Sequence, residues 1–245
     1  MNKDVIINYF IGTSGWNYKH WKGRFYPQDI KQKEWLDFYS KKFSTVEVNY
    51  SFYNWPKVKT LKKWRKQTPG EFKFTLKVPR FITHYKKLKN IDQDVQKLYR
   101  LTSNLEQKLG CHLFQLPPSF HKEEETVERL KHLLKIMDAR KNNAIEFRHK
   151  SWWEDETFDL LDEYGIGFCT VIGLGMPDNV VVTGNIVYFR FHGEHYDTLY
   201  SESEINEFAK TLKNIKGKNC YAYFNNDANA YAPRNALQLK DKLEV

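Results

Sequence analysis

The sequence is short of several features that mark particular classes of protein. No apolar run reaches the roughly 20 residues of a membrane-spanning helix, so we expect no membrane association. The first residues lead into a strand-like run rather than a signal peptide, and the three cysteines are odd in number and widely spaced. This cysteine pattern is typical of reduced core residues, not of a disulfide framework or a zinc cluster. We therefore expect a cytoplasmic protein.

Motifs that carry well-known chemistry are also absent. Gly12-Thr13-Ser14-Gly15 follows a strand-like run but lacks the glycine spacing of a dinucleotide-binding fingerprint. The sequence contains no P-loop, no G-x-S-x-G nucleophile motif and no H-E-x-x-H zinc motif. No nucleotide cofactor is therefore indicated, and the identity of any cofactor is left unknown.

The sequence is strongly basic. Lys and Arg number 39 against 30 for Asp and Glu, which gives a formal net charge of +9. Much of the excess falls in helix-like stretches such as residues 57–66. Two interpretations stay open: a solvated lysine-rich face, or a surface that attracts anions, nucleic acid among them.

Strand-like and helix-like segments alternate along the chain, which indicates a parallel sheet. Eight such units in this length predict a single (β/α)8 TIM barrel over residues 1–245, of the α/β class. The segment between the sixth and seventh strands is short and rich in Gly, Pro and Asp, so we expect no full helix there. An open, doubly wound sheet is the alternative, and the missing fingerprint disfavours it. The predicted strands are Val5–Thr13, Thr45–Asn49, Phe72–Val78, Cys111–Leu116, the stretch from Asn143, and residues 167–172, 186–191 and 220–224; the predicted helices span residues 32–42, 58–67, 92–108, 123–137, 154–164, 203–213 and 233–243.

Most predicted strands have one apolar row and one mixed row, because side chains alternate along a strand. In a barrel one row faces the helices and the other faces the interior. We expect apolar rows such as Val46 and Val48 to meet the helices and the mixed rows to point inward. The polar members of the mixed rows gather toward the carboxyl ends of the strands, where barrel enzymes build their sites. They are Glu47, Asn49, Lys77, Gln115, Glu146, Arg148, Arg190, His192, Tyr223 and Asn225.

This grouping predicts a site for a small anionic or phosphorylated ligand. The planar fork of arginine suits carboxylate or phosphate, so Arg148 and Arg190, with Lys77, are expected to clamp the anion. Glu47 or Glu146 would act as acid or base. We expect His192 to assist, and further ligand contacts from Trp16, Asn49, Arg80, Gln115, Tyr223, Asn225 and Asp227. The alternative is a self-satisfied network, in which the two glutamates pair with the arginines and Lys77.

The aromatic, basic loop around Trp16 and Trp21 also has two interpretations. It would cover the site as a lid or binding platform, or it would pack and close one end of the core. Replacing Arg190 with Met is expected to abolish ligand binding while the barrel still folds.

A metal site is considered and not favoured. Metal-binding barrels take carboxylates and histidines from different strand ends. The basic residues nearby would compete with a cation for the carboxylates, so we assign no metal ligands. A glycosidase using Glu47 and Glu146 is conceivable, with an outcome that depends on their separation. The side chains that could in principle converge on a metal are Glu47, His84, Glu146, His149, His192, His195 and Asp227.

Several motifs, in order and over nearly the whole chain, resemble those of the YecE-like family of bacteria and archaea, catalogued as domain of unknown function family 72. One mild departure is Tyr50, which adds bulk upstream of Ser51. The matching segments are Ile11–Trp16, Phe25–Pro27, Thr45–Asn49 with Phe52-Tyr53, Lys77–His84, Leu113–Pro118, Glu146–His149 with Trp152, Arg190–Gly193, Tyr223–Asp227 and Ala232–Ala236.

The resemblance implies a TIM-barrel fold but no particular reaction, because the family has no settled activity. Barrel nucleases of the apurinic-endonuclease type are similar in architecture, which is an analogy of fold alone. Three functions therefore stay open: an enzyme acting on a small anion, a nucleic-acid-binding or nuclease-like protein, and a non-catalytic ligand sensor. Whether the protein is an enzyme, and its oligomeric state, are left undecided.

Overall fold

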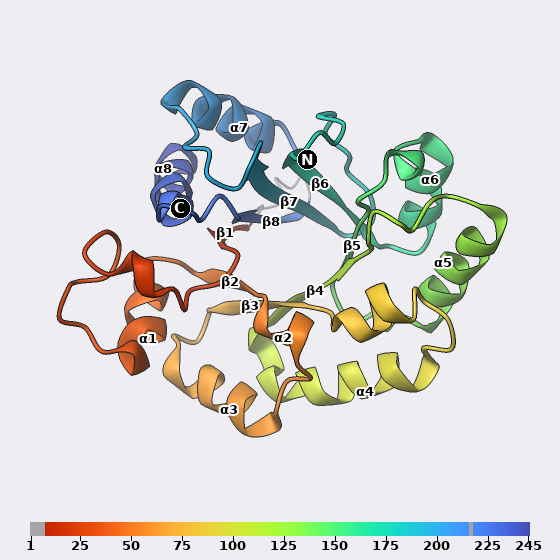
Figure 1. Cartoon of the computed structure of the whole chain (residues 1–245), viewed down its shortest axis with the longest axis horizontal. Helices are drawn as coiled ribbons and strands as arrows, with labels where there is room; N and C mark the ends of the chain where they lie inside the picture. The colour runs from red at the N-terminus through yellow and green to blue at the C-terminus, as the bar shows by residue number, and fades with distance from the viewer. Residues whose placement is uncertain (1–7, 216–217) are drawn as a thin grey trace, which may run out of the picture.

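A computed structural model describes residues 8–215 and 218–245, and its eight strands form one parallel sheet that curls into a nearly closed barrel (Figure 1). The strand order is β1-β8-β7-β6-β5-β4-β3-β2, and every pairing is parallel. The expected TIM-barrel class is confirmed, while residues 5–7 of the first predicted strand lie outside the described residues. The strands are β1 (Tyr9–Thr13), β2 (Thr45–Val48), β3 (Lys73–Lys77), β4 (Leu109–Gln115), β5 (Asn143–Glu146), β6 (Gly167–Gly173), β7 (Ile186–Gly193) and β8 (Asn219–Phe224).

Helices connect most of the strands and surround the sheet (Figure 1). The β6–β7 connection contains no helix, as predicted. The predicted 92–108 helix changes to 3-10 geometry after Thr102, and a short helix at Tyr50–Tyr53 was not expected. The α-helices are α1 (Trp35–Ser40), α2 (Tyr50–Tyr53), α3 (Val58–Gln67), α4 (Asp92–Thr102), α5 (Glu124–Ile136), α6 (Asp155–Glu163), α7 (Glu202–Asn214) and α8 (Tyr231–Leu243), with shorter helical turns at Lys19–Trp21, Gln32–Glu34, Phe81–Tyr85, Ser103–Lys108 and Lys150–Trp152.

The two rows of each strand separate as the alternation predicts. Phe74 on β3 stacks on Trp64 of α3, and Phe191 on β7 packs against Phe208 of α7, so these apolar rows face the helices. The opposite rows fill the barrel with a small, buried apolar cluster that includes Cys111. Polar members of these same rows stand above this cluster at the carboxyl ends of the strands.

Between β1 and β2 the barrel closes because the two backbones lie close together, and not through a continuous series of backbone hydrogen bonds. An isolated parallel bridge joins Ser14 to Glu47. A Cβ atom on Gly12 would lie 2.4 Å from the Thr45 carbonyl oxygen, so only glycine allows β1 to come this near β2. The closure brings the end of β1 beside the inward row of β2. In the part of the chain described here, no helix combines the length and the apolar character needed to cross a bilayer.

Candidate functional site

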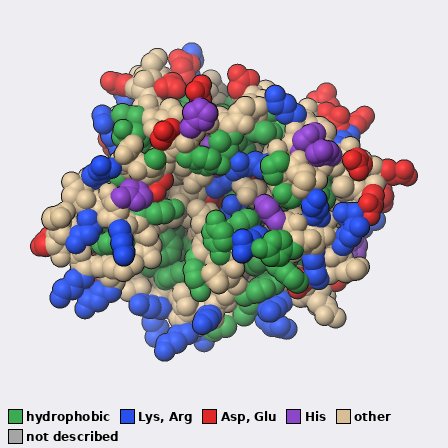
Figure 2. Space-filling view, in the orientation of Figure 1, with side chains coloured by type: hydrophobic (Ala, Val, Ile, Leu, Met, Phe, Trp, Pro, Cys, Tyr) green, Lys and Arg blue, Asp and Glu red, His purple; other side chains and the backbone are tan. Residues whose placement is uncertain are grey.

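A cavity of about 710 Å³ opens at the carboxyl ends of the strands, where polar side chains were expected to gather. Its volume lies within the range of small-molecule sites in proteins. Figure 2 shows a hollow near the centre of the face, with basic side chains inside it and hydrophobic ones at its border. The lining residues are Gly15, Trp16, Asn17, Tyr18, Val48, Asn49, Tyr50, Tyr53, Trp64, Lys77, His84, Gln115, Pro118, Arg148, Arg190, Tyr196 and Asn225.

The lining contains three cationic side chains, those of Lys77, Arg148 and Arg190, and no aspartate or glutamate among the described residues. Aromatic rings and side-chain amides make up much of the remainder. The carboxylates of this region lie deeper, because Glu47 and Glu146 are fully buried beneath the lining. The side chains that a ligand would meet are therefore basic, amide or aromatic.

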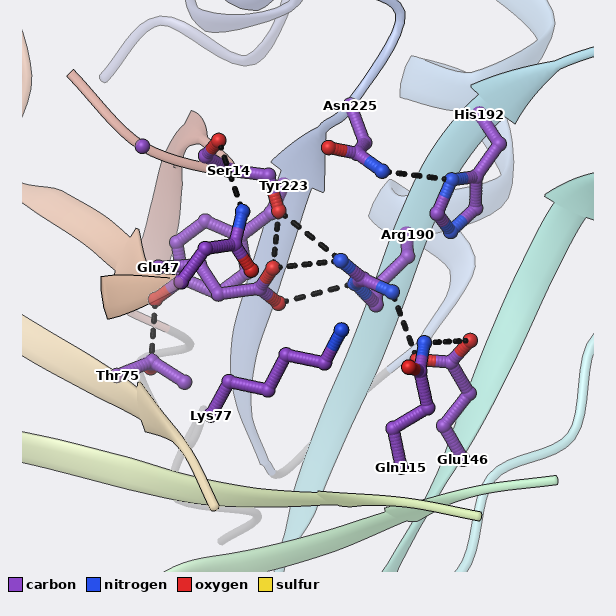
Figure 3. A network of polar contacts seen from close by, with 12 residues as sticks. Ser14, Glu47, Thr75, Lys77, Gln115, Glu146, Arg190, His192, Tyr223 and Asn225 are labelled. Atoms are coloured by element: carbon purple, nitrogen blue, oxygen red, sulfur yellow. Dashed lines mark hydrogen bonds and ion pairs between the residues drawn. The ribbon is translucent and has the colours of Figure 1, made fainter. Parts of the chain in front are cut away.

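Arg190 lies at the centre of a buried ion-pair network with the two glutamates (Figure 3). Its Nε and Nη2 atoms donate to the two oxygens of Glu47 at 3.0 and 2.7 Å, and its Nη1 donates to Glu146 at 2.8 Å. Nη2 also donates to the Ser14 hydroxyl at 3.1 Å. A bidentate pair of this kind is strong and fixes orientation. Ion pairing of this kind offsets part of the penalty of burying both carboxylates.

Each glutamate has further partners that use its remaining oxygen positions. Glu47 accepts from Ser14 and from the Tyr188 hydroxyl, the latter at 2.6 Å. Glu146 accepts from Arg148 and, at 2.9 Å, from the Gln115 amide. Burial alone would raise the pKa of Glu146, but the charges of Arg148 and Arg190 outweigh burial and hold that pKa well below its usual range. Glu146 is therefore a carboxylate at neutral pH and is poorly suited to donate a proton.

His192 belongs to the same network as a neutral ring. Burial, followed by the charges of Arg190 and Arg148, lowers the pKa of His192 far below its ordinary value. Arg148 Nη2 lies 3.3 Å from His192 Nε2, and arginine can only donate. A neutral ring that accepts from Arg148 at Nε2 carries its proton on Nδ1. The structure places Asn225 Nδ2 2.9 Å from Nδ1, so the Asn225 amide accepts that proton only after the amide flips and brings its oxygen to the ring. Both nitrogens of His192 are thus occupied within the protein.

Lys77 differs from its neighbours. Its side chain is nearly buried at the end of β3, and its amino group makes no hydrogen bond or ion pair with any described residue. The Nζ atom lies 4.0 Å from the centre of the Phe52 ring. Burial, and then the charge of Arg190, lower the pKa of Lys77 to about 7. A large fraction of these amines is therefore neutral at physiological pH.

Two further groups in the lining are not fully used by the protein. Asn49 donates its amide nitrogen to the Ser14 carbonyl oxygen at 3.2 Å, which leaves its buried Oδ1 without a partner in the described structure. A buried acceptor of this kind favours a ligand that carries a hydroxyl or amine donor. His84 bonds to the Thr83 hydroxyl at 2.9 Å, and burial, then the charge of Lys77, lower its pKa to about 4.

The structure places the predicted site residues in three groups. Seven line the cavity: Trp16, Asn49, Lys77, Gln115, Arg148, Arg190 and Asn225. Four lie beneath it in hydrogen-bonded positions: Glu47, Glu146, His192 and Tyr223, whose hydroxyl bonds to Thr45 and Thr75 at 2.7 and 2.8 Å.

The remaining two, Arg80 and Asp227, are outside the lining. Arg80 lies on the rim, against the rings of Tyr53 and Tyr85.

Asp227 instead fastens the aromatic loop to the end of β8. Its carboxylate accepts from Trp21 Nε1 at 2.5 Å and lies 3.2 Å from His20. Burial raises the pKa of Asp227 to about 6. Trp21 is fully buried among other rings and does not cover the cavity, which corrects the lid interpretation for that residue, while Trp16 does line the cavity.

Sequence reasoning did not assign Ser14, Tyr188 or His84 to the site. Tyr188 shares the strand parity of Arg190 and His192, and this signal was available. Ser14 could have been found from its place in the turn that ends β1. His84 follows β3 in a helical turn, and no periodicity marks the direction of its side chain. Across the described residues, no three His, Cys, Asp or Glu side chains are grouped closely enough to hold a metal ion.

Comparisons with known proteins agree with the resemblance. A sequence model described as "Protein of unknown function DUF72" matches residues 10–245. The UPF0759 protein YunF of Bacillus subtilis is 26% identical over 274 residues, covering 96% of this chain and 95% of that protein. The UPF0759 protein YecE of Escherichia coli is 28% identical over 144 residues, 59% of this chain and half of that protein.

A solved structure gives the same result for the fold. The crystal structure of a DUF72 family protein from Thermotoga maritima is 33% identical, covers 97% of this chain and 100% of its own, and superposes with a TM-score of 0.89. A structure of a DUF72 family protein from Enterococcus faecalis, 22% identical, has a TM-score of 0.84 and shares the fold.

Proposed function

The chain belongs to the DUF72 family, and we propose that its cavity binds a small anionic organic ligand. The observation that carries the proposal is the composition of the lining, which has three cations and no carboxylate among its described residues. A carboxylate or phosphate group of the ligand would lie against Arg148 and Lys77. The aromatic walls would contact the body of the ligand.

The balance of charge beneath the cavity supports an anion. The charges of Arg190 and Arg148 are matched by those of Glu47 and Glu146, which lie within hydrogen-bond distance of them. A protonated Lys77 is therefore one positive charge in excess. An anion would compensate this charge beside a nearly buried side chain, where the attraction is stronger than at the surface.

Unused hydrogen-bonding atoms support an organic ligand rather than a bare ion. The free Oδ1 of Asn49 would accept from a hydroxyl or amine of the ligand. Pockets with apolar walls and a few directed polar groups are typical of sites for small molecules. Turnover of the bound compound would distinguish an enzyme from a ligand sensor, and both would bind the same compound.

A thermal-shift screen tests the proposal. The panel would contain phosphate, sugar phosphates, hydroxy acids and keto acids at low and high salt. A ligand at about 100 times its Kd adds roughly 2.7 kcal/mol to the free energy of unfolding. For a chain of this size, that is on the order of 5–10 °C. We expect such a shift from at least one small anion, and we expect it to persist in salt.

A matched pair of variants locates the binding. Arg148→Gln should remove the shift, because the guanidinium lines the cavity while Glu146 keeps Arg190 and Gln115 as partners. Arg140→Gln is the control, since Arg140 is exposed, lies outside the cavity lining and pairs with Asp138. A shift that survives Arg148→Gln, or no shift from any anion, would contradict the proposal.

A second candidate, nucleic-acid binding, is favoured by the rim of the cavity. Tyr53 and Tyr85 are more than half exposed, and Arg80 lies against both rings at 5.3 and 5.2 Å. Exposed rings interleaved with cations suit stacking on single-stranded bases. Binding of short single-stranded DNA should then weaken steeply with salt, and weaken further in Tyr53→Ala. If neither salt nor Tyr53→Ala weakened the binding of single-stranded DNA, this candidate function would be excluded.

A further inference from the structure

The amino group of Lys77 makes no hydrogen bond or ion pair with the described protein, although two carboxylates lie in the same cluster. Glu47 and Glu146 are both engaged with Arg190, and Lys77 forms no ion pair with either. In Figure 3 the lysine points toward Arg190, and no dashed line reaches its amino group. A lysine that only balanced charge would be expected to pair with a carboxylate. The network instead holds the carboxylates away from the amine.

The surroundings of the amine favour a reactive role. The Nζ atom is nearly buried at the carboxyl end of a barrel strand, where barrel enzymes place catalytic groups. It borders the cavity, beside the face of Phe52. The cations Arg190 and Arg148 lie nearby, and so do Glu146 and Glu47, whose charges act in the opposite direction but do not outweigh burial and Arg190. Burial and neighbouring positive charge both favour the neutral amine, which is the nucleophilic form. The lowered pKa of Lys77 agrees with this geometry.

We propose that Lys77 forms an imine with the carbonyl group of an anionic ligand, a keto acid or a phosphorylated aldehyde or ketone. This inference rests on the proposed function, because the anionic group would direct the carbonyl carbon to the amine. The Nζ lone pair attacks the carbonyl carbon, and a carbinolamine forms. The two protons of the amine then leave with the carbonyl oxygen as one molecule of water, and a C=N bond remains.

Two neighbouring groups suit a neutral amine and the orientation of the ligand. The His84 ring lies 4.9 Å from the Phe52 ring, which Lys77 also contacts, and its lowered pKa keeps it neutral, so it adds no positive charge beside the amine. The buried Oδ1 of Asn49 would accept from a hydroxyl group of the ligand. No redox step is needed, so the proposal requires no further reactant.

Reductive trapping tests the inference. The full-length protein at pH 7 is treated with cyanoborohydride and one of two matched pairs of probes. The first pair is glyceraldehyde 3-phosphate and glyceraldehyde, and the second is pyruvate and acetone. We expect intact mass spectrometry to show one rapid adduct with an anionic probe, and peptide mapping to place it on Lys77. Its rate should exceed that of every other lysine by at least about tenfold, because an ordinary lysine is almost fully protonated at this pH.

Three variants separate a reactive lysine from a merely cationic one. Lys77→Met should lose the rapid adduct. Lys77→Arg should also lose it, because a guanidinium stays protonated at this pH and cannot attack a carbonyl carbon. Lys73→Met is the matched control, since Lys73 begins the same strand and its Nζ donates to the Gln107 carbonyl oxygen at 2.7 Å. That variant should form the adduct at the wild-type rate.

The outcomes distinguish the two proposals. A thermal shift from anions without a rapid adduct on Lys77 would overturn the imine and leave anion binding in place. A Lys77 adduct that forms equally fast with the neutral probes would support the imine and overturn anion binding. Absence of both the adduct and the shift would overturn both.

Discussion

The buried ion-pair network differs from the cavity lining above it in how many of its polar atoms have hydrogen-bond or ion-pair partners. Both regions are built from the same kinds of polar side chain. In the network, formed by Glu47, Glu146, Arg148 and Arg190, donors and acceptors meet at hydrogen-bond distance. In the lining, Lys77 and Asn49 keep polar atoms that no described residue uses. Satisfied groups hold a fold together, whereas unsatisfied buried groups reduce its stability and persist where a ligand uses them.

The comparison implies that substitutions in the two regions change stability in opposite directions. We expect Arg190→Met to lower the free energy of unfolding by about 3–5 kcal/mol, because it leaves Glu47 without its cation. Urea denaturation measures this loss. A loss below about 1 kcal/mol would show that the network contributes little. The sequence-based prediction that the barrel of this variant still folds and loses ligand binding stays a prediction, and the buried ion pairs add an expected loss of stability to it.

Lys77→Met should instead stabilise the protein at pH 7. The folded-state pKa of Lys77 is about 7, below its ordinary value of 10.5, so the unfolded chain binds more protons between these pH values. Burial of the Lys77 amino group therefore lowers the free energy of unfolding. This loss of stability is complete below pH 7 and disappears as the pH rises toward 10.5. We expect a gain of up to about 4 kcal/mol at pH 7, which shrinks to below about 1 kcal/mol at pH 10. If Lys77→Met lowered the free energy of unfolding at pH 7, burial of the Lys77 amino group would not reduce the stability of the protein.

The neutral His192 should make the network sensitive to acid. Its folded-state pKa is far below 6.5, so only the unfolded chain takes up this proton as the pH falls below 6.5. Each pH unit below that value should remove up to about 1.4 kcal/mol of stability. His192→Asn should reduce the proton uptake on unfolding by one, measured from urea denaturation between pH 6 and pH 5. An unchanged pH dependence would mean that His192 is charged when folded.

The smallest effect is expected on the rim. Arg80 contacts exposed rings and no carboxylate in the described structure, so Arg80→Gln should change stability by less than about 0.5 kcal/mol. It should leave the affinity of the cavity for a small anion within about twofold, because Arg80 does not line it. A large loss of affinity, measured by calorimetry, would extend the site to the rim.

The alternation of strand-like and helix-like segments was enough to predict the fold, and strand parity predicted the inward position of the polar rows. Tyr188, Arg190 and His192 alternate with apolar residues on β7, and that alternation alone fixes their side of the sheet. It could not predict which inward groups pair, because pairing depends on the depth and stagger of neighbouring strands. From the sequence alone, an ion pair between Glu47 and Lys77 was therefore as plausible as an ion pair between Glu47 and Arg190.

The aromatic loop shows a second limit. Trp16 and Trp21 lie in one polar, aromatic segment, and nothing in the pattern separates the ring that lines the cavity from the ring that is buried. The distinction comes from Asp227, whose carboxylate binds the indole of Trp21 across 206 positions of sequence. A contact between such distant residues has no signature in a local pattern.

The titration of Lys77 is the most direct test of this account. The pKa of its amine is measured by NMR of lysines labelled at the ε position, with Lys77→Met to assign the signal. The account predicts a pKa near 7 in the free protein and a rise when phosphate occupies the cavity, because an anion stabilises the charged form. A Lys77 that titrates near 10.5 and does not respond to phosphate or to any bound anion would contradict it.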